Sequence, residues 1–193
     1  TAAYAGNYKK LAAILREYKK TFGKDTIEAA AELEGLLGVY DEAKLQSVLS
    51  QYCIGVKTGF SGTKKSFAID TLADDLEKKS EWITTHIRET EWFTDTEGYS
   101  RYNGYYDNSG NALEKNGDKH GNPAMMLTSQ VFTVMSGIAS EDQIAEIVKS
   151  ADKYIYDASI GGYKLNTDFR EVKTDMGRMF GFSYGQKENG AVF

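Results

Sequence analysis

The sequence predicts an all-α fold, on the basis of two observations. Six segments carry apolar side chains at intervals of three and four residues, the spacing that places them on one face of a helix. These segments are 5–22, 25–37, 41–53, 66–92, 125–138 and 141–154. The connections between them are alternately short and long, as in a helical bundle or an α/α-barrel, in which the long loops gather at one end and build the site.

The first three helices are predicted from their apolar faces and their ends. One face of 5–22 carries Leu11, Leu15, Tyr18 and Phe22, and that of 25–37 carries Ile27, Ala30, Leu33 and Leu37. Gly23 and Gly38 stop these helices. Asp41 can cap the third helix, and Cys53 lies in its apolar stretch, so we expect Cys53 in the core.

The other helices flank a long loop. Residues 66–92 predict one long helix, and residues 93–123 predict loops rich in Gly, Asn, Asp and Tyr, with a short hairpin at 105–110. Loops of this length in a compact domain usually carry function. After the helix at 125–138, Ser140 and Gln143 form a capping box that opens the last helix. Residues 163–193 are again loop-like, with glycines that allow close approach of a ligand.

Composition excludes several classes of protein. The net charge of −5 is spread over interspersed acids and bases, which argues against a nucleic-acid partner. No apolar segment is long enough to span a bilayer, so we expect no membrane partner. The single cysteine excludes an internal disulfide and argues against a cysteine-based zinc site. A cytoplasmic location is the simplest interpretation.

The aromatic residues indicate a class of ligand. Aromatic side chains make up 12% of the chain, mostly from 13 Tyr and 9 Phe. Rings with polar edges suit clefts that hold sugars, which have an apolar face and a hydroxyl rim. Tyrosine also fills cores and rims in many proteins, and apolar clefts with a few polar groups bind many kinds of ligand.

The C-terminal residues place a polar site beside an apolar run. A cation, an anion and an amide are adjacent at Lys187, Glu188 and Asn189, and Gly190 precedes Ala191-Val192-Phe193. No capping residue or turn closes the element that this run begins. We therefore expect residues 1–193 to be a single partial domain, cut from a longer protein next to a polar site.

Four blocks in order resemble glycoside hydrolase family 94, the inverting disaccharide and oligosaccharide phosphorylases. They are Tyr-Asn-Gly-Tyr-Tyr-Asp-Asn-Ser-Gly at 102–110, Leu-Thr-Ser-Gln-Val-Phe-Thr-Val-Met-Ser-Gly at 127–137, Asp-Met-Gly-Arg-Met-Phe-Gly at 175–181 and Lys-Glu-Asn-Gly-Ala-Val-Phe at 187–193. The resemblance covers the C-terminal half well, and the first ninety residues match only as generic helices. Within the family, the blocks look most like the long enzymes acting on β-1,2-linked glucans.

The resemblance implies a fold and a reaction. The fold would be part of an (α/α)6 barrel with long loops at the active-site end. The enzyme would cleave a β-glucosidic bond with inorganic phosphate as co-substrate and release α-glucose 1-phosphate, with no other cofactor and no metal. An Asp would protonate the leaving oxygen, and phosphate would take the place of a base-activated water. Lys187 and Glu188 match the charged pair that binds the sugar, although a surface ion pair is the alternative. We expect a β-linked glucose oligosaccharide as substrate and a homodimeric parent protein.

Two departures limit what the resemblance assigns. The general-acid Asp of the family belongs to an Asp-Trp motif upstream of these blocks, whereas Trp82 and Trp92 each follow a Glu. The phosphate-binding His of the family follows the Glu-Asn-Gly motif, and neither His86 nor His120 matches it. We therefore expect the acid and part of the phosphate site outside this chain.

Three carboxylates in the tyrosine-rich loop are weaker candidates for the acid: Asp95, Glu97 and Asp107. A general acid needs a pKa raised by burial or by a like charge. Asp107, before Asn-Ser-Gly, is explained more simply as a turn residue.

Three other functions stay open. An ordinary hydrolase on the same barrel would use water and a second carboxylate as base. A non-catalytic sugar-binding module would bind without turnover. A helical bundle whose tyrosine-rich loops are only surface would do neither.

Overall fold

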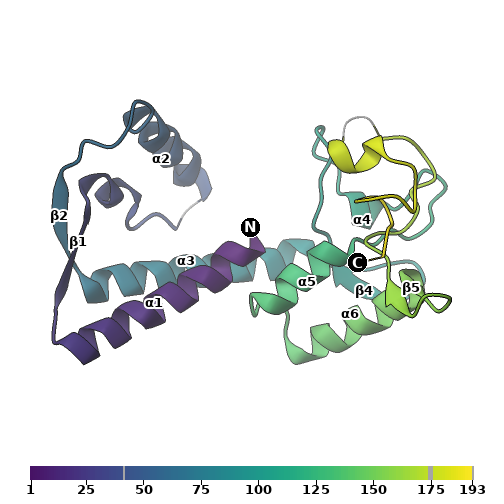
Figure 1. Ribbon diagram of the computed structural model, residues 1–193, viewed down its shortest axis with the longest axis horizontal. Coiled ribbons are helices and arrows are strands. Elements are labelled where there is room, and N and C mark those ends of the chain that lie inside the picture. The colour runs from purple at the N-terminus through teal and green to yellow at the C-terminus, as the bar shows by residue number, and fades with distance from the viewer. Residues whose placement is uncertain (41, 174–175, 193) are drawn as a thin grey trace. The chain divides into compact units, whose positions relative to one another are not determined.

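The computed structural model describes residues 1–40, 42–173 and 176–192 (Figure 1). Helices account for most of its regular structure, so the prediction of a mainly helical chain is confirmed, and the barrel stays a prediction. The chain divides into two compact units, one with Thr1 and Ala3–Thr85, the other with Ala2 and the residues from His86 onward. No helix in the described residues has the length and apolarity needed to cross a bilayer.

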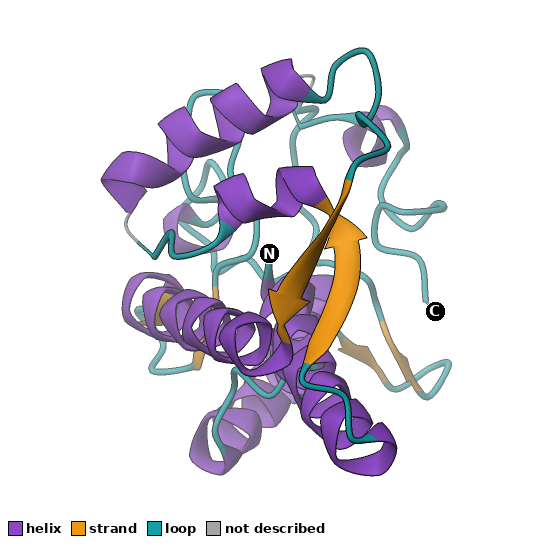
Figure 2. Cartoon of the chain, turned by 90° about the vertical axis from the view of Figure 1, so that its left-hand side faces the viewer, coloured by secondary structure: helices purple, strands orange, loops and turns teal. Residues whose placement is uncertain are grey.

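The first unit holds two long helices and a smaller α/β portion. Its elements are α1 (Ala2–Phe22), β1 (Thr26–Ala30), the 3-10 helix η1 (Ala31–Leu36), α2 (Glu42–Gly55), β2 (Lys64–Ala68) and most of α3 (Ile69–Glu91). Figure 2 shows β1 and β2 as a twisted ribbon that leads from α1 and α3 to η1 and α2. The core of this unit includes Leu15, Phe67 and Leu72, with Ile27 and Leu33 packed against it.

The helix predicted over 25–37 is wrong. Residues Thr26–Ala30 form a strand antiparallel to Lys64–Ala68, with Ile27 opposite Phe67. The partner strand lies far away in sequence, so a local pattern of apolar residues could not show it. Pairing with β2 turns Ile27 and Ala29 toward the core, and Leu33 follows on η1.

The predicted core face of α1 is largely wrong. Leu15 is buried, but Leu11, Tyr18 and Phe22 are 46%, 37% and 64% exposed. The buried face is instead made of small residues with Leu15: Ala5, Gly6 and Ala12. Ser80 Oγ on α3 donates to Ala5 C=O at 2.8 Å, and Arg16 reaches Asp74 and Glu77 on α3, at 2.7 Å each.

The third helix is confirmed as α2, although its predicted cap, Asp41, lies outside the described residues. Cys53 is exposed, so its predicted place in the core is wrong. Its neighbour Ile54 is 73% exposed as well. The apolar character of this stretch therefore belongs to a surface of α2 that the described residues leave uncovered.

The second unit follows the end of α3. Its elements are β3 (Trp92–Thr94), β4 (Ser100–Tyr102), α4 (Leu113–Asn116), α5 (Leu127–Met135), α6 (Glu141–Tyr154), β5 (Tyr156–Asp157), β6 (Gly162–Tyr163) and the 3-10 helix η2 (Arg178–Gly181). Strands β3 and β4 form one antiparallel hairpin, and β5 and β6 form another. The predicted helix over 141–154 and its capping box from Ser140 to Gln143 are confirmed.

Two predicted helices are shorter than expected. Helix α3 begins at Ile69 because residues 66–68 belong to β2. Helix α5 begins at Leu127 because Met126 is extended and forms a bridge with Asn166. The loop predicted over 93–123 contains β4 and α4 as well as the turn expected near 105–110. A bridge between Tyr106 and Ala112 closes that turn.

Candidate functional site

The motif blocks of the C-terminal half converge in the second unit, beginning with those at 102–110 and 127–137. The Gln130 side chain on α5 accepts from Tyr102 N–H at 3.0 Å and donates to Tyr102 C=O at 2.8 Å, as a neighbouring strand would. Gly104 follows, and a Cβ added there would lie 2.1 Å from Ser129 Oγ. The loop after β4 therefore passes so close to α5 that it admits only glycine.

A buried carboxylate joins the same two blocks. Glu114 on α4 is 1% exposed. Its oxygens accept from the N–H groups of Gly104 (2.5 Å) and Met126 (2.8 Å). They also accept from Ser129 Oγ (3.1 Å) and Gln130 Nε2 (3.2 Å). Burial raises the pKa of Glu114 to about 7, and these hydrogen bonds offset part of that effect.

The C-terminal block is anchored by a second buried polar group, Asn166. Its Oδ1 accepts from Gly190 N–H at 2.7 Å, and its Nδ2 donates to Asn189 Oδ1 at 3.0 Å. Asn189 Nδ2 donates in turn to Phe182 C=O at 2.7 Å. The segment at 164–166 pairs with Met126 on one side and Val192 on the other, so three distant segments meet here.

Gly190 is required by this arrangement. Its φ is +71°, and a Cβ added there would lie 2.1 Å from the ring of Tyr184, whose hydroxyl donates to Asn166 C=O. We expect Gly190→Ala to lower the free energy of unfolding by about 2 kcal/mol, from backbone strain together with overpacking. Chemical unfolding of the two proteins measures this difference.

Gly181→Ala is the matched control, because a Cβ there meets nothing within 4 Å and its φ is not positive. If the two alanine variants are equally stable, the close contact between Gly190 and Tyr184 does not exist in solution.

Lys187 and Glu188 lie in the turn over 183–189, beside the ring of Phe182 and the side chain of Arg178. Lys187 Nζ lies 4.6 Å from the centre of the Phe182 ring, and the Arg178 guanidinium lies 5.8 Å from it. Glu188 Oε1 pairs with Arg178 at 3.1 Å, and not with Lys187 as the surface-pair alternative expected. Glu188 Oε2 is buried and has no hydrogen-bond partner among the described residues.

A pocket of about 340 Å³ lies beside this turn. Its lining is a mixture of charges, hydroxyls, an amide and aromatic rings: Asp168, Phe169, Arg170, Glu171, Val172, Phe180, Phe182, Ser183, Tyr184 and Asn189. Apolar faces with a few polar groups are typical of small-molecule sites. The composition would suit a sugar ring.

Backbone strain is concentrated at the same place. Among the described non-glycine residues, the two with positive φ are Arg170 (54°) and Lys187 (48°). Arg170 lines the pocket, and Lys187 belongs to the turn that borders it. Such strain costs roughly 1–3 kcal/mol per residue and is concentrated at functional sites in proteins.

The three weaker candidates for the general acid have structural roles. Asp95 pairs with the buried Arg101 at 2.5 Å and accepts from Tyr154 Oη at 2.8 Å. Burial alone would raise the pKa of Asp95, but these bonds outweigh it and hold the pKa below its usual value. Glu97 forms an exposed ion pair with Lys153 at 3.4 Å.

Asp107 is the turn residue that the sequence indicated. Its carboxylate accepts from Asn111 Nδ2 at 2.8 Å and from Ser109 N–H at 2.9 Å. The bonds from Asn111, the largest cause, lower the pKa of Asp107 below its usual value. An acid held in its ionised form cannot protonate a leaving group. His120 is exposed in its loop, and His86 is exposed on α3. Neither is among the residues that line the pocket.

Sequence reasoning missed Glu114, Asn166 and Arg178. The first two are polar side chains buried by contacts with distant segments, and no local signal marks them. Arg178 lies in the motif block at 175–181, and its place in that block is the signal in the sequence that could have identified it. The described residues include no group of three or more His, Cys, Asp or Glu side chains placed to hold a metal ion.

Comparison with known proteins identifies one family. The family model described as "Glycosyl hydrolase 94 superfamily, catalytic domain" matches residues 42–193, most of the chain. No curated protein matches. The resemblance that the four motif blocks predicted is therefore confirmed at the level of the family.

Proposed function

Because this chain belongs to the glycosyl hydrolase 94 superfamily, we propose that it forms part of the catalytic domain of an inverting glycoside phosphorylase. The enzyme cleaves a β-glucosidic bond of a glucose oligosaccharide or disaccharide with inorganic phosphate and releases α-glucose 1-phosphate. The observation that carries the proposal is the mixed polar and aromatic pocket beside the strained turn, to which the last two motif blocks contribute Phe180 and Asn189.

In this proposal Lys187 and Glu188 bind the sugar. Lys187 donates hydrogen bonds, and Glu188 accepts them. Glu188 Oε2 supports this role, because a buried carboxylate oxygen without a donor is costly until a ligand hydroxyl supplies one. Asn189, which the sequence grouped with this pair, has its amide occupied by Asn166 and Phe182. We therefore propose that Asn189 shapes the turn and part of the pocket wall, and that its amide is not the main group that bonds the sugar.

The other expectations complete the proposal. The domain belongs to an (α/α)6 barrel, and the parent protein is a cytoplasmic homodimer without metal or organic cofactor. The general acid and part of the phosphate site lie outside these residues. Asp95 and Asp107 are held ionised by their partners, which supports that location of the acid.

The test is the dependence of sugar release on phosphate in the intact enzyme. Oligosaccharide is incubated with and without phosphate, and free glucose and glucose 1-phosphate are measured separately. Phosphorolysis gives α-glucose 1-phosphate in the phosphate arm alone. Equal release of free sugar in both arms would assign a hydrolase on the same fold.

The 193-residue chain by itself is expected to show no phosphorolysis. The reason is the absence of an Asp-Trp motif and of a His after Glu-Asn-Gly in this sequence. The purified chain is incubated with β-glucan oligosaccharides and phosphate. Measurable sugar 1-phosphate would place the acid within residues 1–193, with Asp95 and Asp107 as the first candidates to replace.

A further inference from the structure

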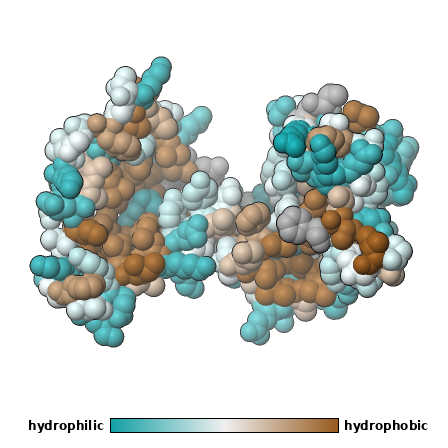
Figure 3. Space-filling view, viewed as in Figure 1, coloured by the Kyte–Doolittle hydropathy of each residue, from teal (hydrophilic) through white to brown (hydrophobic). Residues whose placement is uncertain are grey.

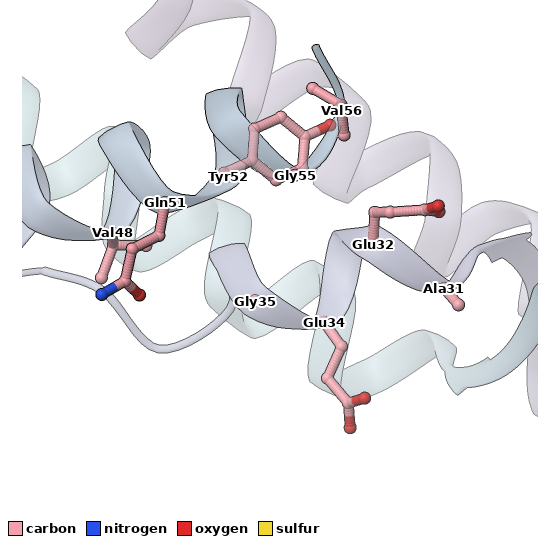
Figure 4. A pocket seen from close by; sticks show the side chains of 9 residues that line it. All are labelled: Ala31, Glu32, Glu34, Gly35, Val48, Gln51, Tyr52, Gly55 and Val56. Carbon is pink, nitrogen blue, oxygen red and sulfur yellow. The ribbon is translucent and has the colours of Figure 1, made fainter. Parts of the chain in front are cut away.

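A second pocket lies in the first unit, between η1 and α2, with a volume of about 480 Å³. Figure 4 shows Tyr52 on α2, and Val56 directly after it, opposite Ala31 and Glu32 on η1, with Gln51 at the other end. Figure 3 shows apolar residues gathered over this part of the molecule. The volume falls in the usual range for small-ligand clefts, about 300–1,000 Å³. The η1 wall precedes residue 42, so it lies outside the match to the family.

Glu32 gives this pocket an unused acceptor. Its Oε1 accepts from Ser61 N–H at 2.7 Å, and that bond is the largest cause of the lowered pKa of Glu32. The carboxylate is therefore ionised. Its Oε2 is buried and has no partner among the described residues. A buried, ionised oxygen without a donor favours a ligand that brings one.

The other carboxylate of the lining is already neutralised. Glu34 forms an ion pair with Lys65, and Figure 4 shows its side chain directed away from α2. The pocket thus offers one free anionic acceptor, the amide of Gln51, the ring of Tyr52 and the apolar side chains of Val48 and Val56. An uncharged ligand with hydroxyl donors and an apolar face matches this set more closely than a cation does.

We propose that this pocket is an accessory carbohydrate-binding site, which holds a β-linked glucan chain at a place separate in sequence from Lys187 and Glu188. Glu32 Oε2 accepts from a sugar hydroxyl, Gln51 bonds a second hydroxyl, and the Tyr52 ring covers the apolar face of the sugar. The glucan as ligand rests on the proposed function. The site itself rests on the pocket and the unpartnered oxygen.

The test is an NMR titration of the labelled 193-residue chain with cellotetraose, laminaritetraose and sophorotetraose, and with arginine as a cationic probe. The amide signals of η1 and α2 are expected to shift with at least one tetrasaccharide and not with arginine. Tyr52→Ala is expected to weaken binding about tenfold, from the loss of one aromatic contact. Gln46→Ala, on the exposed surface of α2 outside the pocket, is the matched control and keeps wild-type affinity.

Gly35→Phe tests the site without removing a packed side chain. A Cβ at Gly35 meets nothing within 4 Å, and its φ is not positive, so a ring there fills the pocket without backbone strain. This variant is expected to abolish the shifts. Shifts that persist in Gly35→Phe, shifts caused by arginine and not by glucans, or no shifts with any tetrasaccharide would each overturn the proposal. If the intact enzyme makes no glucose 1-phosphate and the titration still succeeds, only the proposed function fails.

Discussion

Glu188→Gln in the intact enzyme is expected to lower kcat/KM about tenfold to a hundredfold. A hydrogen bond from a desolvated sugar hydroxyl to a carboxylate contributes roughly 1.5–3 kcal/mol. Each 1.4 kcal/mol corresponds to about a factor of ten. Glu188 has an acceptor for such a bond, because Arg178 occupies Oε1 and Oε2 is buried with no partner among the described residues. Steady-state kinetics with oligosaccharide and phosphate measure the effect.

The same variant is expected to change thermal stability little. The side chains of Arg178 and Glu188 are 74% and 46% exposed, and exposed ion pairs contribute at most about 1 kcal/mol. Glu97→Gln is the matched control, because Glu97 forms an ion pair of similar exposure with Lys153. Glu97→Gln should keep wild-type kinetics. Wild-type kinetics in Glu188→Gln as well would leave the surface ion pair as the whole role of Glu188.

The elements that the sequence predicts well are those determined by neighbouring residues. Helix α6 is the clearest, because Ser140 and Gln143 bond each other's backbone across three residues. The turn at Asp107 is similar, since the carboxylate bonds residues two and four positions along the chain. Both depend on local hydrogen bonds that the residue types and their spacing specify.

The elements that the sequence mispredicts depend on distant partners. Ile27 has helical spacing with its apolar neighbours, yet it pairs with Phe67 in a ribbon. Phe22 lies on an apolar face of α1 and is 64% exposed. The spacing of apolar residues identifies such a face, but it does not show whether another element covers it. Cys53 is a second example, since it lies in an apolar stretch of α2 and is exposed.

The candidate site shows the same limit at the level of single residues. The motif blocks identified Lys187 and Glu188, but not the buried groups that hold their turn in place. Asn166 bonds Asn189 and Gly190 across more than twenty residues of sequence. Glu114 is a charged residue in a polar segment, which sequence reasoning treats as exposed, and the structure surrounds it with four donors.

Glu114→Gln is expected to change how stability depends on pH. Burial raises the pKa of Glu114 from 4.5 to about 7 in the folded state. Between these values the folded protein holds a proton that the unfolded chain releases. Stability that depends on this group is therefore fully present below pH 4.5 and is lost as pH rises to about 7. The loss is on the order of 3 kcal/mol, since one pKa unit corresponds to about 1.4 kcal/mol.

Glutamine cannot release that proton, so the variant lacks this contribution at every pH. The amide keeps the shape of the side chain but supplies one acceptor oxygen in place of two, which adds a constant cost. The wild type should therefore be the more stable protein near pH 5. The difference should shrink, or reverse, as the pH approaches 8, because ionised Glu114 is then buried at a cost that the amide does not have.

Urea unfolding followed by circular dichroism, at pH values from about 5 to about 8, measures this difference. Glu97→Gln is again the control, because it makes the same substitution at a side chain that is 44% exposed. A difference between wild type and Glu114→Gln that stays constant over this range would show that the four donors, and not burial, determine the charge of Glu114. The group would then be a permanently ionised anchor for Gly104, Met126 and the first turn of α5.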